Sequence, residues 1–193
     1  MENYKKKDQN FISVLTVFNK NAIPYWVCHG TLLGIIRDKE LIEWDHDIDI
    51  GVLFDHVSVK EIINLMTKEG FKIRDDYGTF GLHTDTISFT RKGGRIVDIN
   101  FYKISKEDTG EEFFHVRWGT PKNNLMKLVD ALSMADTYAG KYKKLINSFS
   151  LFKFFFKILK IILIRIKLFY KITGYSEPAN LIIAPKIIYF QGL

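Results

Sequence analysis

The chain has 193 residues, enough for one domain with a substantial core and room for an appendage. Its hydrophobic content of 47% and aromatic content of 15% exclude a disordered chain. The single cysteine, Cys28, excludes an internal disulfide and a zinc site built from several cysteines. It lies in a predicted strand, where we expect a buried structural thiol rather than a nucleophile.

The formal net charge of +6 is distributed unevenly along the chain. Residues 1–140 contain 18 Lys and Arg against 21 Asp and Glu, whereas residues 141–193 contain 10 against one. This asymmetry indicates that the tail meets an anionic surface, either nucleic acid or acidic lipid. Residues 1–10 are polar and lack the apolar segment of a secretory signal, which predicts a cytosolic protein.

The spacing of apolar residues predicts alternating helices and strands in the first half of the chain. The expected elements are a helix over 8–21, a strand over 24–28, a short helix capped by Thr31, a strand over 47–54 and a helix over 56–69 that stops at Gly70. In the second half we expect strands over 71–74, 86–91 and 95–103, then a helix-rich segment from Asn123 with a break at Gly140. Gly93 and Gly94 predict a hairpin between the last two strands. The pattern is that of an α/β (α+β) fold, a small mixed sheet with helices packed against it.

We divide the chain into a main domain over 1–148 and a basic amphipathic helical tail over 149–193. On a helix over 151–172, a narrow stripe of about 80° is formed by Lys153, Lys157, Lys160, Lys167 and Lys171. The longest uninterrupted apolar run, Ile161–Ile164, is too short to span a bilayer. We therefore expect a helix in the membrane interface, with its lysines reaching anionic headgroups. The alternative is a helix buried against the domain or a partner subunit. Nucleic acid is disfavoured, because stacking aromatics would have to be exposed beside the charges.

Three aspartates occupy alternate positions at the start of the strand expected over 47–54 and just before it. Asp45, Asp47 and Asp49 would project from one face, whereas His46 and Ile48 would point to the other. Like charges on one strand face repel each other, and a shared cation would relieve the repulsion. His46 is therefore expected to pack, and so is Trp44 in the preceding loop. The pattern predicts a divalent metal site and phosphate chemistry.

A further carboxylate, Asp98, lies in an apolar strand and shares a strand face with Asn100. An aspartate in such a strand is costly unless it is paired or bound to metal, or lies at a solvated strand end. We expect Asp98 to meet Asp47 and Asp49 across the sheet, where oxygen ligands suit Mg²⁺. His83, in a predicted loop near the hairpin, is a candidate substrate-binding residue. His29, before the glycine turn, could contact phosphate or make a structural hydrogen bond.

Two motifs together resemble the signature of the LicD/fukutin-related family, within the nucleotidyltransferase-fold superfamily. They are His29-Gly30-Thr31-Leu32-Leu33-Gly34-Ile35-Ile36-Arg37 and Trp44-Asp45-His46-Asp47-Ile48-Asp49-Ile50-Gly51. The resemblance covers residues 20–55 well and the strand holding Asp98 more loosely. Thr31 replaces the serine usual in the wider superfamily and precedes Asp47 by a longer gap, which favours the LicD branch.

This resemblance implies site residues and a reaction. Asp47, Asp49 and Asp98 would bind Mg²⁺ or Mn²⁺ and be catalytic, with Asp45 as an additional candidate ligand. The motif residues Gly30, Thr31, Gly34 and Arg37 would hold the donor phosphates, at a helix N-terminus that favours anions. The reaction would transfer a phospho-alcohol group, such as phosphocholine or ribitol phosphate, from a CDP-linked donor.

The implied acceptor is a hydroxyl of a cell-surface glycan (lipopolysaccharide, capsule or teichoic acid) or of its lipid-linked precursor. The enzyme would work at the inner face of the membrane, and an oligomer is possible. Two alternatives stay open. One is a nucleotidylyltransferase that transfers NMP from CTP or ATP and releases pyrophosphate, and the other is a non-catalytic membrane-associated module.

Overall fold

The computed structural model describes residues 8–74, 80, 84–106, 110–133 and 150–178. The chain divides into two compact units, which are described separately. Residues 118–173 form unit 2, and the rest of the chain forms unit 1. This boundary differs from the division after residue 148 that we drew from charge and periodicity.

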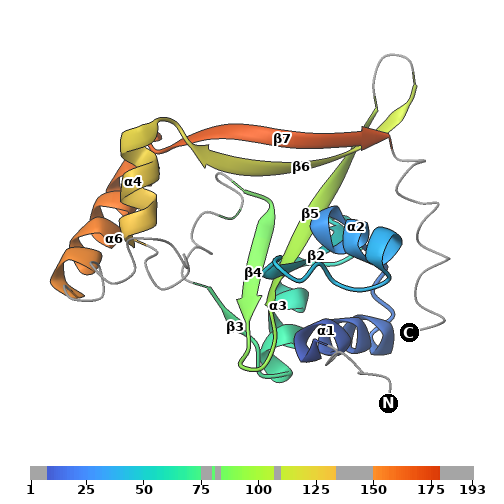
Figure 1. The fold of residues 1–193 in the computed structure, drawn as a ribbon. Helices are drawn as coiled ribbons and strands as arrows, with labels where there is room; N and C mark the ends of the chain where they lie inside the picture. Colours follow the sequence, from blue (N-terminus) through green and yellow to red (C-terminus); the bar gives the residue numbers. More distant parts are fainter. Residues whose placement is uncertain (1–7, 75–79, 81–83, 107–109, 134–149, 179–193) are drawn as a thin grey trace. The chain divides into compact units, whose positions relative to one another are not determined.

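The described part of the chain contains five helices and seven strands, which alternate only as far as β3 (Figure 1). Unit 1 contains α1 (Gln9–Lys20), β1 (Tyr25–Val27), α2 (His29–Asp38), β2 (Asp47–Leu53), α3 (Val59–Lys68), β3 (Lys72–Ile73), β4 (Thr86–Thr90) and β5 (Ile96–Lys106). They are followed by β6 (Glu112–Pro121), α4 (Asn124–Ser133), α6 (Ser150–Arg165) and β7 (Tyr170–Pro178). The sequence did not predict β6 or β7.

The strands form a mixed sheet in the order β1-β2-β5-β4-β3, with β6 paired to β5 and to β7. The central strands β2 and β5 are parallel, whereas β1 and β4 flank them as antiparallel neighbours. The hairpin predicted at Gly93 and Gly94 is confirmed between β4 and β5. The expected α/β fold with a small mixed sheet is confirmed as well.

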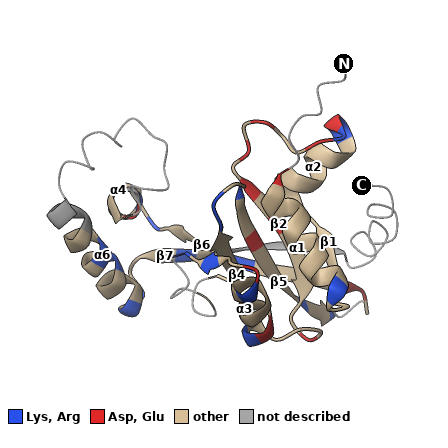
Figure 2. Cartoon of the chain, turned by 90° about the horizontal axis from the view of Figure 1, so that it is seen from below, with Lys and Arg blue, Asp and Glu red and all other residues tan. Residues whose placement is uncertain are grey.

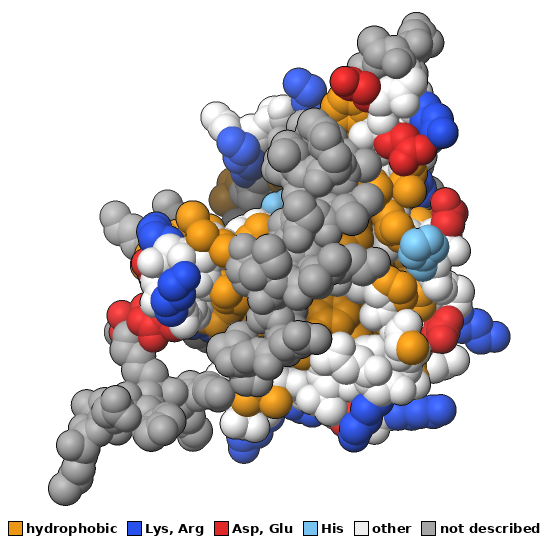
Figure 3. Space-filling model, turned by 90° about the vertical axis from the view of Figure 1, so that its right-hand side faces the viewer, with side chains coloured by type: hydrophobic (Ala, Val, Ile, Leu, Met, Phe, Trp, Pro, Cys, Tyr) orange, Lys and Arg blue, Asp and Glu red, His pale blue; other side chains and the backbone are white. Residues whose placement is uncertain are grey.

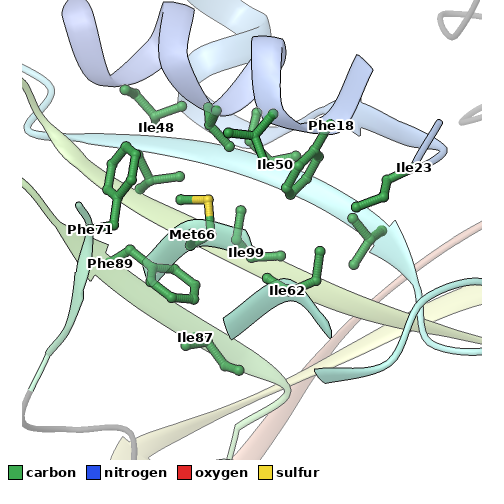
Figure 4. Packing of buried hydrophobic residues seen from close by; sticks show 14 of the residues in the cluster. Phe18, Ile23, Ile48, Ile50, Ile62, Met66, Phe71, Ile87, Phe89 and Ile99 are labelled. Carbon is green, nitrogen blue, oxygen red and sulfur yellow. The ribbon is translucent and has the colours of Figure 1, made fainter. Parts of the chain in front are cut away.

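Alternation along the central strands builds the hydrophobic core of unit 1. Ile48 and Ile50 on β2 and Val97 and Ile99 on β5 are fully buried, as period-2 patterning requires. They point toward α1 and α3, whose buried side chains include Phe18, Ile62 and Met66 (Figure 4). The aspartates of β2 and β5 alternate with these residues and therefore lie on the opposite face of the sheet.

Local hydrogen bonds explain where the helices of unit 1 begin and end. Asp8 caps α1 by accepting from the backbone N–H groups of Asn10 and Phe11, and Ser58 caps α3. Gly70, at φ +81°, ends α3 as predicted, because Phe71 N donates to Met66 O across it. Our expectation that Thr31 caps α2 is wrong. The helix begins at His29, with Cys28 at the N-cap position, and the Thr31 hydroxyl is bonded elsewhere.

Unit 2 consists of two packed helices and the paired ends of two strands. The ammonium group of Lys160 on α6 lies 2.8 Å from a carboxylate oxygen of Asp130 on α4. Val129 and Phe169 are buried beside this pair, and Lys122 N donates to Phe169 O. The core of unit 2 thus contains a charged pair as well as apolar side chains.

The predicted helix over 151–172 is wrong beyond Arg165. Lys167 adopts the left-handed conformation at φ +58°, and Leu168 N donates to Leu163 O, so that α6 ends in a Schellman turn. Residues from Tyr170 then form β7. The expectation that the whole lysine stripe reaches anionic headgroups is also wrong at Lys160, which is buried against α4. Among the described residues, no helix is both long enough and apolar enough to cross a membrane.

The surface of the molecule is not uniformly polar. On the face in Figure 3, hydrophobic side chains are visible between acidic and basic ones.

The charges are unevenly distributed between the two units. Unit 2 holds 11 Lys and Arg against two Asp, a formal net charge of +9, whereas the rest of the chain is slightly acidic.

Candidate active site

The acidic residues of β2 and β5 come together on the face of the sheet that α1 and α3 leave uncovered. The parallel register places Asp49 directly opposite Asp98, and Ser88 on β4 is the next residue across the sheet. Figure 2 shows acidic segments on the central strands beside α2. The predicted approach of Asp98 to the β2 aspartates across the sheet is therefore present in the fold.

Asp47 forms a second pair with Asp45, to which it is hydrogen-bonded. In the described ranges, no three His, Cys, Asp or Glu side chains are gathered closely enough to form a ready-made metal site. The structure thus arranges the predicted ligands as two neighbouring pairs, Asp45 with Asp47 and Asp49 with Asp98.

Burial and mutual repulsion disturb the ionisation of these carboxyl groups. Burial, followed by the charges of Asp98 and Asp47, raises the pKa of Asp49 to about 8. Burial, then the hydrogen bond and charge of Asp45, raises the pKa of Asp47 as well. In the protein alone, the site therefore keeps protons that isolated carboxyl groups would lose near pH 4. A bound cation would offset the repulsion between the carboxylates, and the carboxyl groups could then release these protons.

Two hydrogen bonds fasten the start of α2 to the acidic strand. The backbone N–H of Asp49 donates to the Thr31 hydroxyl at 2.8 Å, and Cys28 N donates to Asp49 O at 3.1 Å. Thr31 is only 2% exposed, so its hydroxyl is an internal brace at this position. The glycine turn and the metal-ligand candidates consequently form one structural unit.

Gly30 allows a carboxylate to approach the N-terminus of α2. A Cβ atom at Gly30 would lie 2.3 Å from Oδ2 of Asp45, a distance that no side chain tolerates. The other oxygen of Asp45 accepts from the backbone N–H of His46 at 3.0 Å. A negative charge at this end of the helix is favourable, because the unpaired N–H groups carry partial positive charge. Asp45 therefore occupies the position where a phosphate is also favoured.

The other motif residues differ in their placement. Gly34 is buried under the loop that follows α2, and a Cβ there would lie 2.7 Å from Glu40 O and 2.9 Å from Ile42 N. Arg37 is exposed in the last turn of α2, about 9 Å along the helix axis from Thr31, and pairs with Asp38 at 2.6 Å. Arg37 therefore makes its ion pair with Asp38 and not with the aspartates of β2 or β5. His83 lies outside the described residues.

Sequence reasoning did not select Asn100, although it placed this residue on the strand face of Asp98. Asn100 is 1% exposed and donates from Nδ2 to Oδ1 of Asp49 at 3.3 Å. Its own Oδ1 accepts from the Thr86 hydroxyl at 2.6 Å, which fixes the orientation of the amide. The i+2 spacing from Asp98 was the available signal, but the pairing with Thr86 depends on the sheet register.

Histidine and aromatic residues surround the site. His29 lies 3.1 Å from the Tyr102 hydroxyl through Nε2, and burial lowers the pKa of His29, so that the ring is neutral at pH 7. This geometry favours the structural hydrogen bond over a charged phosphate contact. Tyr102 in turn packs on Trp26, which lies across Gly51 and stacks on Phe114.

Two expectations about the loop before β2 are wrong. Trp44, expected to pack that loop, is 73% exposed. His46, expected to pack on the face opposite the carboxylates, is exposed because it precedes the first residue of β2. The error for His46 comes from extending the strand pattern into a loop, where alternation no longer determines which side chains are buried.

A family model described as "LicD/FKTN/FKRP, nucleotidyltransferase domain" matches residues 22–140, more than half of the chain. The chain belongs to the LicD/FKTN/FKRP family. The matched segment includes the glycine turn, the acidic motif and Asp98, so this LicD domain contains every candidate ligand described above.

Individual relatives match shorter segments of the chain. An uncharacterized protein of Rickettsia typhi is 36% identical over 59 residues, which are 30% of this chain and 19% of that protein. The ribitol 5-phosphate transferase FKRP of human and that of mouse are each 36% identical over 44 residues, 23% of this chain and 9% of FKRP. The chain thus spans about a fifth or less of the length of these relatives.

Proposed function

We propose that this LicD-family chain transfers a phospho-alcohol group from a CDP-linked donor to a hydroxyl of a cell-surface glycan or of its lipid-linked precursor. The observation that carries the proposal is the facing pair Asp49 and Asp98, fastened through Thr31 to the start of α2. The name of FKRP, a ribitol 5-phosphate transferase that shares a short segment with this chain, supports the class of group transferred.

The carboxylates suit a hard divalent cation. All candidate ligands (Asp47, Asp49, Asp98 and the neighbouring Asp45) offer oxygen atoms, which Mg²⁺ and Mn²⁺ prefer. Burial first, and then repulsion from Asp98 and Asp47, raises the pKa of Asp49, and a bound cation would favour its ionised form. We propose Mg²⁺ or Mn²⁺ as the cofactor. When bound, the ion would neutralise charge on the phosphate oxygens of the donor.

The residues around the carboxylates would position the donor. The backbone at Gly30 opens the N-terminus of α2 to an anion, but the carboxylate of Asp45 lies there and must move or share a cation with the phosphate. Thr31 and Gly34, both buried, would act by holding the turn in place. Arg37 would have to exchange its pairing with Asp38 for the phosphate.

The test is CMP release from CDP-ribitol, CDP-choline and CDP-glycerol in the presence of Mg²⁺, with glycan acceptor supplied. The Asp47→Asn and Asp49→Asn variants should lose at least about 100-fold in rate, as expected for groups that stabilise developing charge. Asp55→Asn, in the exposed turn after β2, is the matched control and should retain activity. Equal CMP release by all three variants would contradict the assignment.

A second candidate reaction is supported by the description of the family domain as a nucleotidyltransferase domain. In that case the same carboxylates would assist transfer of NMP from CTP or ATP, with pyrophosphate as the leaving group. Pyrophosphate release from CTP or ATP, without CMP release from any CDP-alcohol, would favour this reaction. Neither product, and no stabilisation of the protein by any nucleotide with Mg²⁺, would favour a non-catalytic module.

A further inference from the structure

Exposed hydrophobic side chains are concentrated in unit 2. Of the sixteen large hydrophobic side chains exposed in the described part of the chain, ten lie between residues 118 and 173. Five of them are on α6 and are 42–65% exposed: Phe154, Phe155, Ile158, Ile161 and Ile162. We call these five residues the apolar face. Soluble proteins rarely expose so many neighbouring large apolar side chains unless the surface binds something.

The periodicity of α6 gathers these residues on one side. At 100° per residue they fall within an arc of about 120°. Lys157 and Lys160 lie outside this arc, and Lys160 is turned inward to its ion pair with Asp130. Lys160 thus turns toward α4 and not toward a membrane surface, while the apolar face is exposed. Leu125 and Leu128 add exposed apolar surface on α4.

The charges around the apolar face indicate which kind of surface it binds. In unit 2 the described residues contain a single acid, Asp130, and Lys160 neutralises it. Exposed cations, among them Arg165, Lys167 and Lys171, follow the apolar face toward the end of α6 and into β7. An apolar face bordered by cations and lacking unpaired acids complements a bilayer with anionic headgroups. Protein interfaces, by contrast, are depleted in lysine.

We propose that unit 2 docks on anionic lipid bilayers by inserting the apolar face of α6 at the headgroup boundary, with Arg165, Lys167 and Lys171 contacting the lipid phosphates. The partner is a lipid surface rather than a second protein. This docking is independent of the proposed transferase reaction, so failure of one does not decide the other.

The test is co-sedimentation of the full chain with vesicles of phosphatidylcholine alone and of phosphatidylcholine with phosphatidylglycerol. Binding should require the anionic lipid and should weaken as salt is added. The Ile158→Ser/Ile162→Ser double variant should bind at least about tenfold more weakly, since it removes two inserted side chains. The matched control is Ile12→Ser/Ile104→Ser, the same change at two isoleucines of unit 1 that are 41% and 42% exposed. Melting curves establish that each variant is folded.

Three results would overturn the proposal. The first is the absence of binding to anionic vesicles, and the second is equal binding to both vesicle types. The third is a concentration-dependent dimer in which the Ile158→Ser/Ile162→Ser variant is monomeric, without vesicle binding by the unmodified chain. That result would assign the apolar face to a second copy. A Lys171→Gln/Arg165→Gln variant should retain its fold and lose affinity for anionic vesicles, whereas unchanged affinity would contradict the role of these cations.

Discussion

Asp49 on β2 lies directly opposite Asp98 on β5, so two carboxyl groups that repel each other when ionised are held together by the register of two parallel strands. The same strands bury Ile48, Ile50 and Ile99 on their other face, and a slip in register would therefore expose the core. The fold fixes the pair at an electrostatic cost, which is visible in the raised pKa of Asp49.

We predict that Asp49→Asn stabilises the protein at pH 8 when metal is removed with EDTA. The pKa of Asp49 is about 8 in the folded chain and near 3.9 in the unfolded chain. Between these values the folded state holds a proton that the unfolded state has lost, so stability falls as pH rises from about 4 to 8. Asparagine cannot ionise and avoids this loss. A gain of 2 kcal/mol would raise Tm by roughly 4–8 °C.

With added Mg²⁺ the unmodified protein should become more stable than Asp49→Asn, which is the reverse of the order in EDTA. A ligand at 100 times its Kd stabilises the protein that binds it by about 2.7 kcal/mol, and Asp49→Asn should lose most of this gain. The exposed Asp55→Asn variant should behave as the unmodified protein in both buffers. If Asp49→Asn melted at a lower temperature in EDTA at pH 8, the electrostatic account of the pair would be wrong.

We predict that Thr31→Val destabilises the fold by about 1–3 kcal/mol, because the N–H of Asp49 would lose its acceptor in a buried position. Thr31→Ser keeps the hydroxyl and should cost less. Urea unfolding of the two variants gives the difference directly. A larger loss for serine than for valine would indicate that packing of the Thr31 methyl group, which valine keeps, matters more than the hydrogen bond.

The two glycines of the motif should respond differently to alanine. At Gly34 the new methyl group would meet backbone atoms of Glu40 and Ile42, so the loop itself must move, at a cost of roughly 1–3 kcal/mol. At Gly30 it would meet only the end of the Asp45 side chain, which can rotate away. Gly34→Ala should therefore lower Tm more than Gly30→Ala, and thermal denaturation of the two variants compares them. A larger loss for Gly30→Ala would show that the position of Asp45 is rigid.

Sequence patterning predicted the parts of the site that depend on local periodicity. Alternation within β2 placed its aspartates on one face of that strand, and the glycine at position 70 marked the end of α3. Both features depend on residues close together in the chain. The family signature supplied the connection between the glycine turn and the acidic strand.

The parts that were missed depend on distant pairings or on residues without a local signal. The hydroxyl of Thr31 is used by Asp49, eighteen positions away, so capping statistics could not identify its role. Lysine at position 167 has no intrinsic preference for the left-handed conformation that ends α6, and the apolar pattern continued past it. The inward turn of Lys160 depends on Asp130 from another helix.

The ion pair between Asp85 and Arg117 should make stability depend on acid pH. Arg117 donates two hydrogen bonds of 2.6 and 2.7 Å to Asp85, and Lys103 lies 3.7 Å away. Burial alone raises the pKa of Asp85, but the hydrogen bonds and charges of Arg117 and Lys103 outweigh it and hold the pKa below its ordinary value. The stabilisation is thus present above about pH 4 and is lost as pH falls through the folded pKa.

Asp85→Asn should therefore cost roughly 1.5–3 kcal/mol at pH 7, the range for hydrogen bonds to charged groups. The difference from the unmodified chain should shrink as pH falls below 4, because the unmodified carboxyl group becomes protonated. Urea unfolding at pH 7 and pH 3 measures both values. A difference that is constant with pH would contradict the ion-pair account.

Finally, we predict that Lys160→Met destabilises unit 2 by about 3–5 kcal/mol, because it leaves the carboxylate of Asp130 largely buried without its cation. Lys127→Met, an exposed lysine on α4, is the control and should have little effect. The double variant Lys160→Met/Asp130→Leu removes both charges and should recover most of the loss, since buried ion pairs are often replaced by apolar residues at little cost. Denaturant unfolding of the unmodified chain, of Lys160→Met, of Asp130→Leu and of the double variant closes the cycle. Additive losses of stability at the two positions would show that Lys160 and Asp130 do not interact. In that case this pair would not hold α6 against α4.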